Sequence, residues 1–130
     1  MWAGRRAGPA ALVAVLGIVA LGGAMGACSS SSGSSAPFSV PGTPVATDRV
    51  EAARSYRFEP AVIAVRAGAT VTWTNHDQFP HTVQLLTGAE RPTHDLGIGR
   101  SATILFDHPG EYYYRCSLHP AQMHGKVIVK

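Results

Sequence analysis

The sequence predicts an all-β domain that folds as a two-sheet antiparallel β-sandwich. Apolar residues recur at every second position through much of the chain after about residue 47. Gly and Pro interrupt these runs at short intervals, and no stretch has the apolar period of a convincing amphipathic helix. Roughly seven short strands separated by turns are typical of a sandwich.

The expected strands follow one another over residues 50–129. The clearest is 70–74, where Val71 and Trp73 alternate with three threonines, so one face is buried and Trp73 belongs to the core. In residues 112–116, Tyr112, Tyr114 and Cys116 share a face. Alternating or β-branched runs also cover 50–58, 61–66, 81–85, 101–106 and 127–129.

The 130 residues suffice for one small domain, which we place at 47–130. Residues 1–27 have a basic start, Arg5 and Arg6, followed by an uncharged apolar run over 10–24, the pattern of an export signal. An uncleaved membrane anchor is the alternative. Residues 28–46 are rich in Ser, Gly and Pro and read as a flexible tether.

The signal segment ends in Met25, Gly26, Ala27 and Cys28, which resembles a bacterial lipobox with Met25 in place of the usual Leu. We therefore expect Cys28 to be lipidated and the domain to be exported, on the outer face of the cell membrane or in the periplasm. Ordinary cleavage and secretion, or retention of the apolar run as an anchor, remain the alternatives.

The charge of the chain argues against a nucleic-acid binder. The formal net charge is +3, but removing residues 1–27 takes away Arg5 and Arg6 and leaves the domain nearly neutral. The Lys and Arg residues are not clustered as in nucleic-acid-binding proteins. A nearly neutral domain also gives no electrostatic signature of a particular partner.

The residues of greatest chemical interest lie near the C-terminus. Cys116 is the only cysteine besides Cys28, and an unpaired thiol in an oxidising compartment needs an explanation such as metal ligation. His119 follows three residues later, Met123 four residues after that, and His81 begins another expected strand. Two imidazoles, a thiolate and a weak thioether form the ligand set of blue-copper electron-transfer sites.

Other interpretations of these residues stay open. Gln122 is an alternative axial donor to Met123, and His124 is expected to be an exposed neighbour rather than a ligand. A buried inert cysteine, a zinc site, and a thiol nucleophile paired with His119 are further possibilities. Zinc is disfavoured because its structural sites use four Cys or His ligands.

The region from Phe58 to Lys130 resembles the plastocyanin and amicyanin branch of the cupredoxins. The spacing from His119 to Met123 lies between those of amicyanin-like and plastocyanin-like loops. The residues that carry the resemblance are Phe58-Glu59-Pro60, Gly68, Thr70–Asn75, Pro80–Val83, Pro109–Tyr112, Cys116-x-x-His119 and Gly125–Val129.

The resemblance implies a Greek-key β-sandwich holding one copper ion and acting as a one-electron carrier, not as an enzyme. It also implies that the backbone N–H of Thr82 points at the Cys116 sulfur, and that the Asn75 side chain holds the ligand loop near Ser117. Redox partners would dock on the apolar patch around His119, and we expect a monomer. A copper storage or delivery module with the same ligands is the alternative function.

Overall fold

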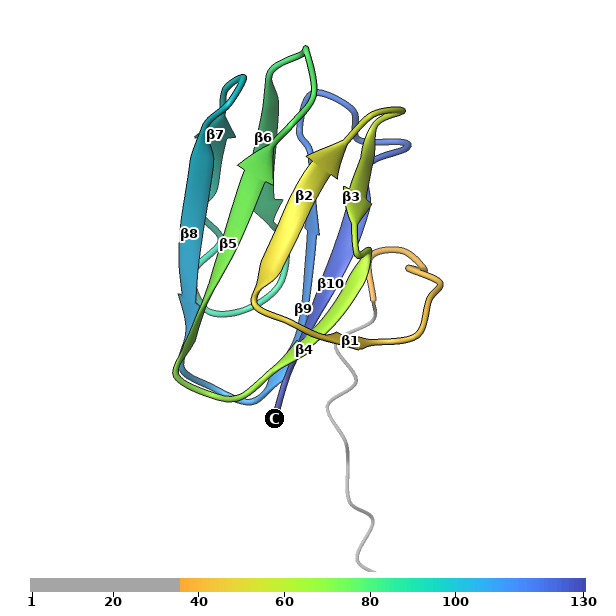
Figure 1. Ribbon diagram of the computed structural model, residues 1–130. Coiled ribbons are helices and arrows are strands. Elements are labelled where there is room, and N and C mark those ends of the chain that lie inside the picture. The colour runs from red at the N-terminus through yellow and green to blue at the C-terminus, as the bar shows by residue number, and fades with distance from the viewer. Residues whose placement is uncertain (1–35) are drawn as a thin grey trace, which may run out of the picture. The chain divides into compact units, whose positions relative to one another are not determined.

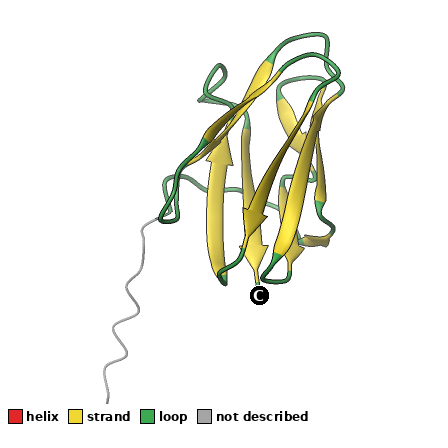
Figure 2. Cartoon of the chain, turned by 90° about the vertical axis from the view of Figure 1, so that its left-hand side faces the viewer, coloured by secondary structure: helices red, strands yellow, loops and turns green. Residues whose placement is uncertain are grey.

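The computed structural model describes residues 36–130, which form two β-sheets packed face to face (Figures 1 and 2). The six-stranded sheet has the order β1 (Val45–Ala46), β4 (Val62–Val65), β10 (His124–Val129), β9 (Gly110–Arg115), β6 (His81–Leu85) and β7 (Thr93–Leu96). The four-stranded sheet has the order β3 (Arg57–Glu59), β2 (Arg49–Ala53), β5 (Ala69–Asn75) and β8 (Ser101–Phe106).

The predicted all-β sandwich is confirmed, but the sheets are mixed rather than purely antiparallel. Three strand pairs are parallel, namely β1 with β4, β4 with β10, and β2 with β5. These pairs arise because the chain crosses between the sheets instead of turning back as a hairpin at every connection. An alternating apolar pattern shows which face of a strand is buried, and it carries no information on the direction of the neighbouring strand.

The core lies between the sheets and is centred on aromatic side chains. Trp73 is fully buried, as predicted, and its ring centroid lies 5.2 Å from that of Tyr114. Phe58 packs against Tyr114 at 4.9 Å. The ring of Tyr114 fills the space beside Gly125, the residue paired with it on β10. Burial raises the pKa of Tyr114 above its usual range, so this hydroxyl stays neutral.

The segment before β2 packs against the sandwich. The Phe38 ring stacks on His124 at a centroid distance of 4.1 Å and meets Tyr113 edge-on at 5.7 Å. Phe38 and β1 belong to residues 28–46, which we expected to form a tether, so contacts with the folded domain begin earlier than residue 47. The expected signal segment and Cys28 lie outside the described residues. Within residues 36–130, no helix is long and apolar enough to span a membrane.

The strand ends that carry the predicted ligands gather at one end of the sandwich, at the top of Figure 1. Strand β6 begins there at His81, β9 ends there at Arg115, and β10 begins there at His124. The β2–β3 and β5–β6 turns close the same end. Residues that are far apart in sequence therefore meet at this edge, opposite the C-terminus.

Candidate metal centre

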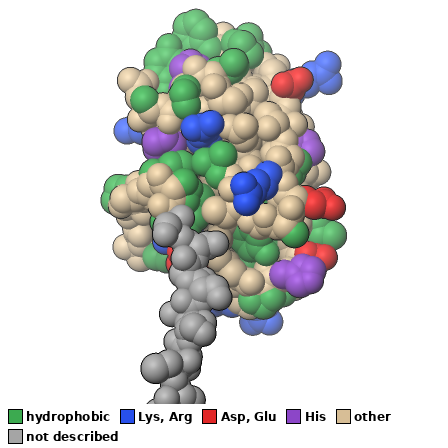
Figure 3. Space-filling model, turned by 180° about the vertical axis from the view of Figure 1, so that it is seen from behind, with side chains coloured by type: hydrophobic (Ala, Val, Ile, Leu, Met, Phe, Trp, Pro, Cys, Tyr) green, Lys and Arg blue, Asp and Glu red, His purple; other side chains and the backbone are tan. Residues whose placement is uncertain are grey.

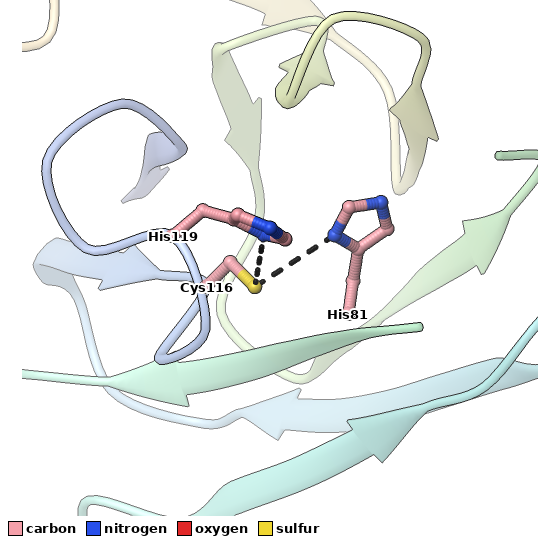
Figure 4. Close-up of side chains that lie close together, drawn as sticks. All are labelled: His81, Cys116 and His119. Carbon is pink, nitrogen blue, oxygen red and sulfur yellow. Dashed lines mark hydrogen bonds between the residues drawn. The ribbon is translucent and has the colours of Figure 1, made fainter. Parts of the chain in front are cut away.

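His81, Cys116 and His119 converge at this end of the sandwich (Figure 4). The Cys116 Sγ lies 3.8 Å from Nδ1 of His81 and 3.6 Å from Nδ1 of His119. All three candidate ligand atoms lie within 4.8 Å of one another. Within residues 36–130, no other group of three or more His, Cys, Asp or Glu residues is arranged to share an ion. Two nitrogens and one sulfur thus face a common point.

Strand β6 supplies hydrogen-bond donors to the Cys116 sulfur. The backbone N–H of Thr82 donates to Sγ at 3.4 Å, and the Thr82 hydroxyl lies 3.8 Å from the same atom. The Cys116 side chain is fully buried. These contacts fix the direction of the sulfur and leave it facing the two imidazoles.

The loop that carries His119 is closed by its own backbone hydrogen bonds. The N–H of Cys116 donates to the Met123 carbonyl at 3.0 Å, which places the two residues side by side where β9 ends and β10 begins. The N–H of Met123 donates to the His119 carbonyl at 3.1 Å, an i to i+4 turn that accommodates the three intervening residues. Met123 is fully buried in the cluster that contains Cys116, whereas the alternative donor Gln122 is exposed.

His81 has a carboxylate partner that the sequence analysis missed. Its Nε2–H donates to Oδ2 of Asp77 at 3.0 Å, and both side chains are buried. The hydrogen bond from His81, together with the backbone N–H of Gln78, lowers the pKa of the Asp77 carboxyl below its ordinary value. A carboxylate on one ring nitrogen fixes the tautomer and directs the other nitrogen, here Nδ1, toward the candidate metal position. The sequence feature that could have indicated this partner is the position of Asp77, a carboxylate four residues before His81 in a short loop.

Asn75 does not hold the loop near Ser117 as we expected. Its side-chain amide donates to the carbonyls of Phe79 and Leu96, and its Oδ1 accepts the N–H of Asp77. Asn75 therefore fixes the turn that leads into His81. The Ser117 N–H instead donates to Oγ1 of Thr82 at 2.7 Å. Thr82 takes this role because β6 lies beside the start of the ligand loop, a proximity that the strand register decides.

His119 is half-buried, and exposed apolar side chains occur at the same end of the sandwich. Phe79, Ile98 and Leu118 are more than half exposed in the loops of the described chain that close this end. Seen from behind, the same end shows hydrophobic side chains gathered around a histidine (Figure 3).

His124, which we expected to be an exposed neighbour of the site, is not part of the group formed by His81, Cys116 and His119. Its Nε2–H donates to the Pro120 carbonyl at 2.6 Å, and its ring stacks on Phe38.

The donor set fits copper, since imidazole nitrogens and thiolate sulfur in a three-ligand arrangement are typical of blue-copper sites. The sequence profile described as "Copper binding proteins, plastocyanin/azurin family" matches residues 46–130. The chain belongs to this family. Copper is therefore the cofactor that the His81, Cys116 and His119 cluster fits, and the resemblance seen in the sequence is confirmed.

Curated members of the plastocyanin/azurin family are similar to this chain over its folded part. Chloroplast plastocyanin of Tetradesmus obliquus is 43% identical over 84 residues, which cover 56% of this chain and 58% of that protein. Amicyanin-alpha of Methylorubrum extorquens is 35% identical over 80 residues, covering 57% of this chain and 65% of that protein. The chain thus spans less than two thirds of the length of these two relatives.

Solved structures of copper proteins share the fold. An oxidised amicyanin variant superposes with a TM-score of 0.58 at 30% identity, covering 63% of this chain and 80% of that one. A copper-containing nitrite reductase from Thermus scotoductus superposes with a TM-score of 0.57 at 31% identity, and the match covers 70% of this chain but only 23% of the reductase. The second likeness thus concerns one part of a larger protein.

Proposed function

We propose that this protein is an exported one-electron carrier whose single type 1 copper ion would be held by His81, Cys116 and His119, with Met123 as a weak fourth ligand. The observation that carries the proposal is the convergence of one sulfur and two nitrogens within 4.8 Å at one end of a β-sandwich. Copper in such a site supplies a Cu(II)/Cu(I) couple that accepts and returns one electron. The burial of Met123 next to Cys116 supports its role as the fourth ligand.

The protein's own residues would keep the ligands in nearly the same place in both oxidation states. Asp77 holds the His81 ring, and Thr82 ties β6 to the start of the Cys116 loop. A backbone hydrogen bond from Cys116 to Met123 holds these two residues side by side. Ligands that are held by such contacts move little when the charge of the ion changes, and a small rearrangement permits fast electron transfer.

Electrons would enter and leave through the half-buried His119. The exposed Phe79 and Leu118 side chains suit weak contact with a redox partner, because transient electron-transfer interfaces are small. We propose that the protein works as a monomer and that lipidated Cys28 tethers it to the outer face of the cell membrane. The lipobox-like sequence supports the tether, and mass spectrometry of the membrane-extracted protein would test it.

The visible spectrum of the domain after addition of Cu(II) tests the proposed function. We expect an intense blue absorption that ascorbate bleaches and that Cys116→Ser abolishes. A matched control is Ser117→Ala, which should retain the colour because Ser117 supplies no proposed ligand atom. A colourless or faint product would refute the electron carrier and favour copper delivery, zinc or thiol chemistry. Retention of the colour in His81→Ala without added imidazole would refute the choice of the second imidazole.

A further inference from the structure

The turn between β2 and β3 has an unusual backbone. Ser55 and Tyr56 both have positive φ angles, of 72° and 56°. Residues other than Gly, Asn and Asp are disfavoured in this left-handed region because their Cβ atom approaches the following carbonyl oxygen. Hairpin turns that need two such residues are normally built from Asn, Asp and Gly. Local sequence preference therefore does not explain why a tyrosine occupies position 56.

The Tyr56 side chain lies over the candidate copper ligands. Its ring centroid is 4.4 Å from that of His119, with an angle of 41° between the ring planes. It also meets the ring of His81 nearly at a right angle at 6.3 Å and lies 6.2 Å from Phe79. Tyr56 is partly exposed. The strained turn thus brings an aromatic ring from the second sheet against a ligand on the first.

The two candidate histidine ligands are held in different ways. His81 is fixed by the buried carboxylate of Asp77. The only side-chain hydrogen bond found for His119 within the described chain is the contact of its Nδ1 with Cys116. Two aromatic rings also lie against its imidazole: the ring of His81, nearly edge-on at a centroid distance of 5.2 Å, and the closer ring of Tyr56 at 4.4 Å. An imidazole on a turn without a polar partner on its outer nitrogen can rotate unless an apolar surface limits it.

We propose that Tyr56 is a positioning residue that fixes the ring plane of His119 and covers part of one face of this imidazole. The inference rests on the proposed function of the copper site. Aromatic rings at this separation attract each other in tilted arrangements. Strained backbone in a protein is found preferentially at functional sites, where surrounding contacts hold it. Asp77 orients the His81 ring through a hydrogen bond, and Tyr56 orients the His119 ring through contact between the two rings.

A set of four variants in the copper-loaded domain tests this role. Tyr56→Leu removes the aromatic contact, and Tyr56→Phe keeps the ring without the hydroxyl. Ser55→Gly relieves the backbone strain at the neighbouring position and leaves the contact in place. Leu105→Ala trims an exposed apolar side chain at the opposite end of the sandwich, since Leu105 pairs with Thr70 near the start of β5.

The measurements are the electron paramagnetic resonance and visible spectra of the Cu(II) form, the reduction potential, and the proton resonances of His119 in the Cu(I) form. We expect Tyr56→Leu to stay blue but to shift the copper hyperfine splitting and the potential, and to move the His119 ring protons downfield as the tyrosine ring current is lost. Tyr56→Phe, Ser55→Gly and Leu105→Ala should match the wild type. In the metal-free domain, Ser55→Gly should melt no lower than the wild type.

The outcomes separate this inference from the proposed function. A wild type that is not blue refutes the electron carrier whatever Tyr56 does. A blue wild type with Tyr56→Leu unchanged in hyperfine splitting, potential and His119 resonances refutes the positioning role alone. Shifts of equal size in Tyr56→Leu and Leu105→Ala would also refute it, because they would show a general response to lost surface packing.

Discussion

Thr82 connects the two segments that supply the proposed ligands, and replacing it with valine tests how far this connection holds the site together. Its Oγ1 accepts the N–H of Ser117 at 2.7 Å and lies 2.8 Å from the Ser117 hydroxyl. The Thr82 hydroxyl also lies 3.8 Å from the Cys116 sulfur. Valine keeps the shape of the side chain and removes all three polar contacts.

The expected loss of stability follows from the donor that the substitution leaves without its partner. An unsatisfied buried donor costs about 1–3 kcal/mol, and the exposure of Ser117 to water places the expected cost at about 1–2 kcal/mol. In a domain of this size each kcal/mol lowers the melting temperature by about 4–8 °C, so the metal-free Thr82→Val domain should melt roughly 5–15 °C below the wild type.

The same substitution should lower the reduction potential of the copper form. Loss of a weak hydroxyl donor near Sγ leaves more negative charge on sulfur, and this charge stabilises Cu(II) over Cu(I). A difference of about 0.5 kcal/mol between the two oxidation states corresponds to roughly 20 mV in a one-electron couple. The backbone N–H of Thr82, which valine retains, limits the change to this size.

Thermal unfolding followed by circular dichroism and a potentiometric titration measure the two effects. Thr82→Ser should recover most of both, because it restores Oγ1. Thr74→Val is the matched control, since its hydroxyl pairs at 2.9 Å with that of Ser101 in an exposed position on the other sheet. The reasoning would be refuted by a Thr82→Val domain that melts with the wild type, or by a Thr74→Val domain that loses as much stability.

Three further predictions concern other parts of the structure. Gly125→Ala should destabilise the metal-free domain by about 3 kcal/mol in denaturant unfolding, because overpacking a core carries a cost of this order and a Cβ at Gly125 would lie 2.6 Å from Cε2 of Tyr114. The hydrogen bond with His81 lowers the pKa of the Asp77 carboxyl below its ordinary value of 3.8. The carboxylate therefore stabilises the metal-free fold at pH values above 3.8, and this stabilisation is lost as the pH falls through the folded pKa. In Asp77→Asn, the free energy of unfolding should fall less steeply in acid than in the wild type. Met123→Leu should keep most of the blue colour and raise the reduction potential, because a lone-pair donor stabilises the more highly charged ion.

Each of these predictions has a control or a contrary result. Gly97→Ala places a Cβ at an ordinary 3.4 Å from Cγ of Arg100 and should cost little, so equal losses at the two glycines would contradict the packing argument. If the free energy of unfolding falls equally in acid for the wild type and Asp77→Asn, the folded state does not stabilise the Asp77 carboxylate. If Met123→Leu leaves both spectrum and potential untouched, the axial assignment is wrong.

Hydrogen-bond partners around the site were the part that sequence reasoning predicted least well. The contact from the Thr82 N–H to Cys116 was anticipated, but the role expected of Asn75 belongs to the Thr82 hydroxyl. Asp77 and Tyr56 were not singled out at all. A carboxylate in a polar loop and a tyrosine in a turn look like ordinary surface residues, because nothing in their spacing shows which loops meet at the end of the sandwich.

The sequence by itself determined the chemical types of the candidate ligands and the faces that the strands bury. These are local properties: a thiol three residues before an imidazole, and apolar side chains at every second position, are visible without knowing the fold. Only the tertiary structure decided that β6 lies beside β9, that several strand pairs run parallel, and that Asp77 and Tyr56 reach His81 and His119. These features depend on strand register and on loop closure across the two sheets, which arise when the whole chain packs at once.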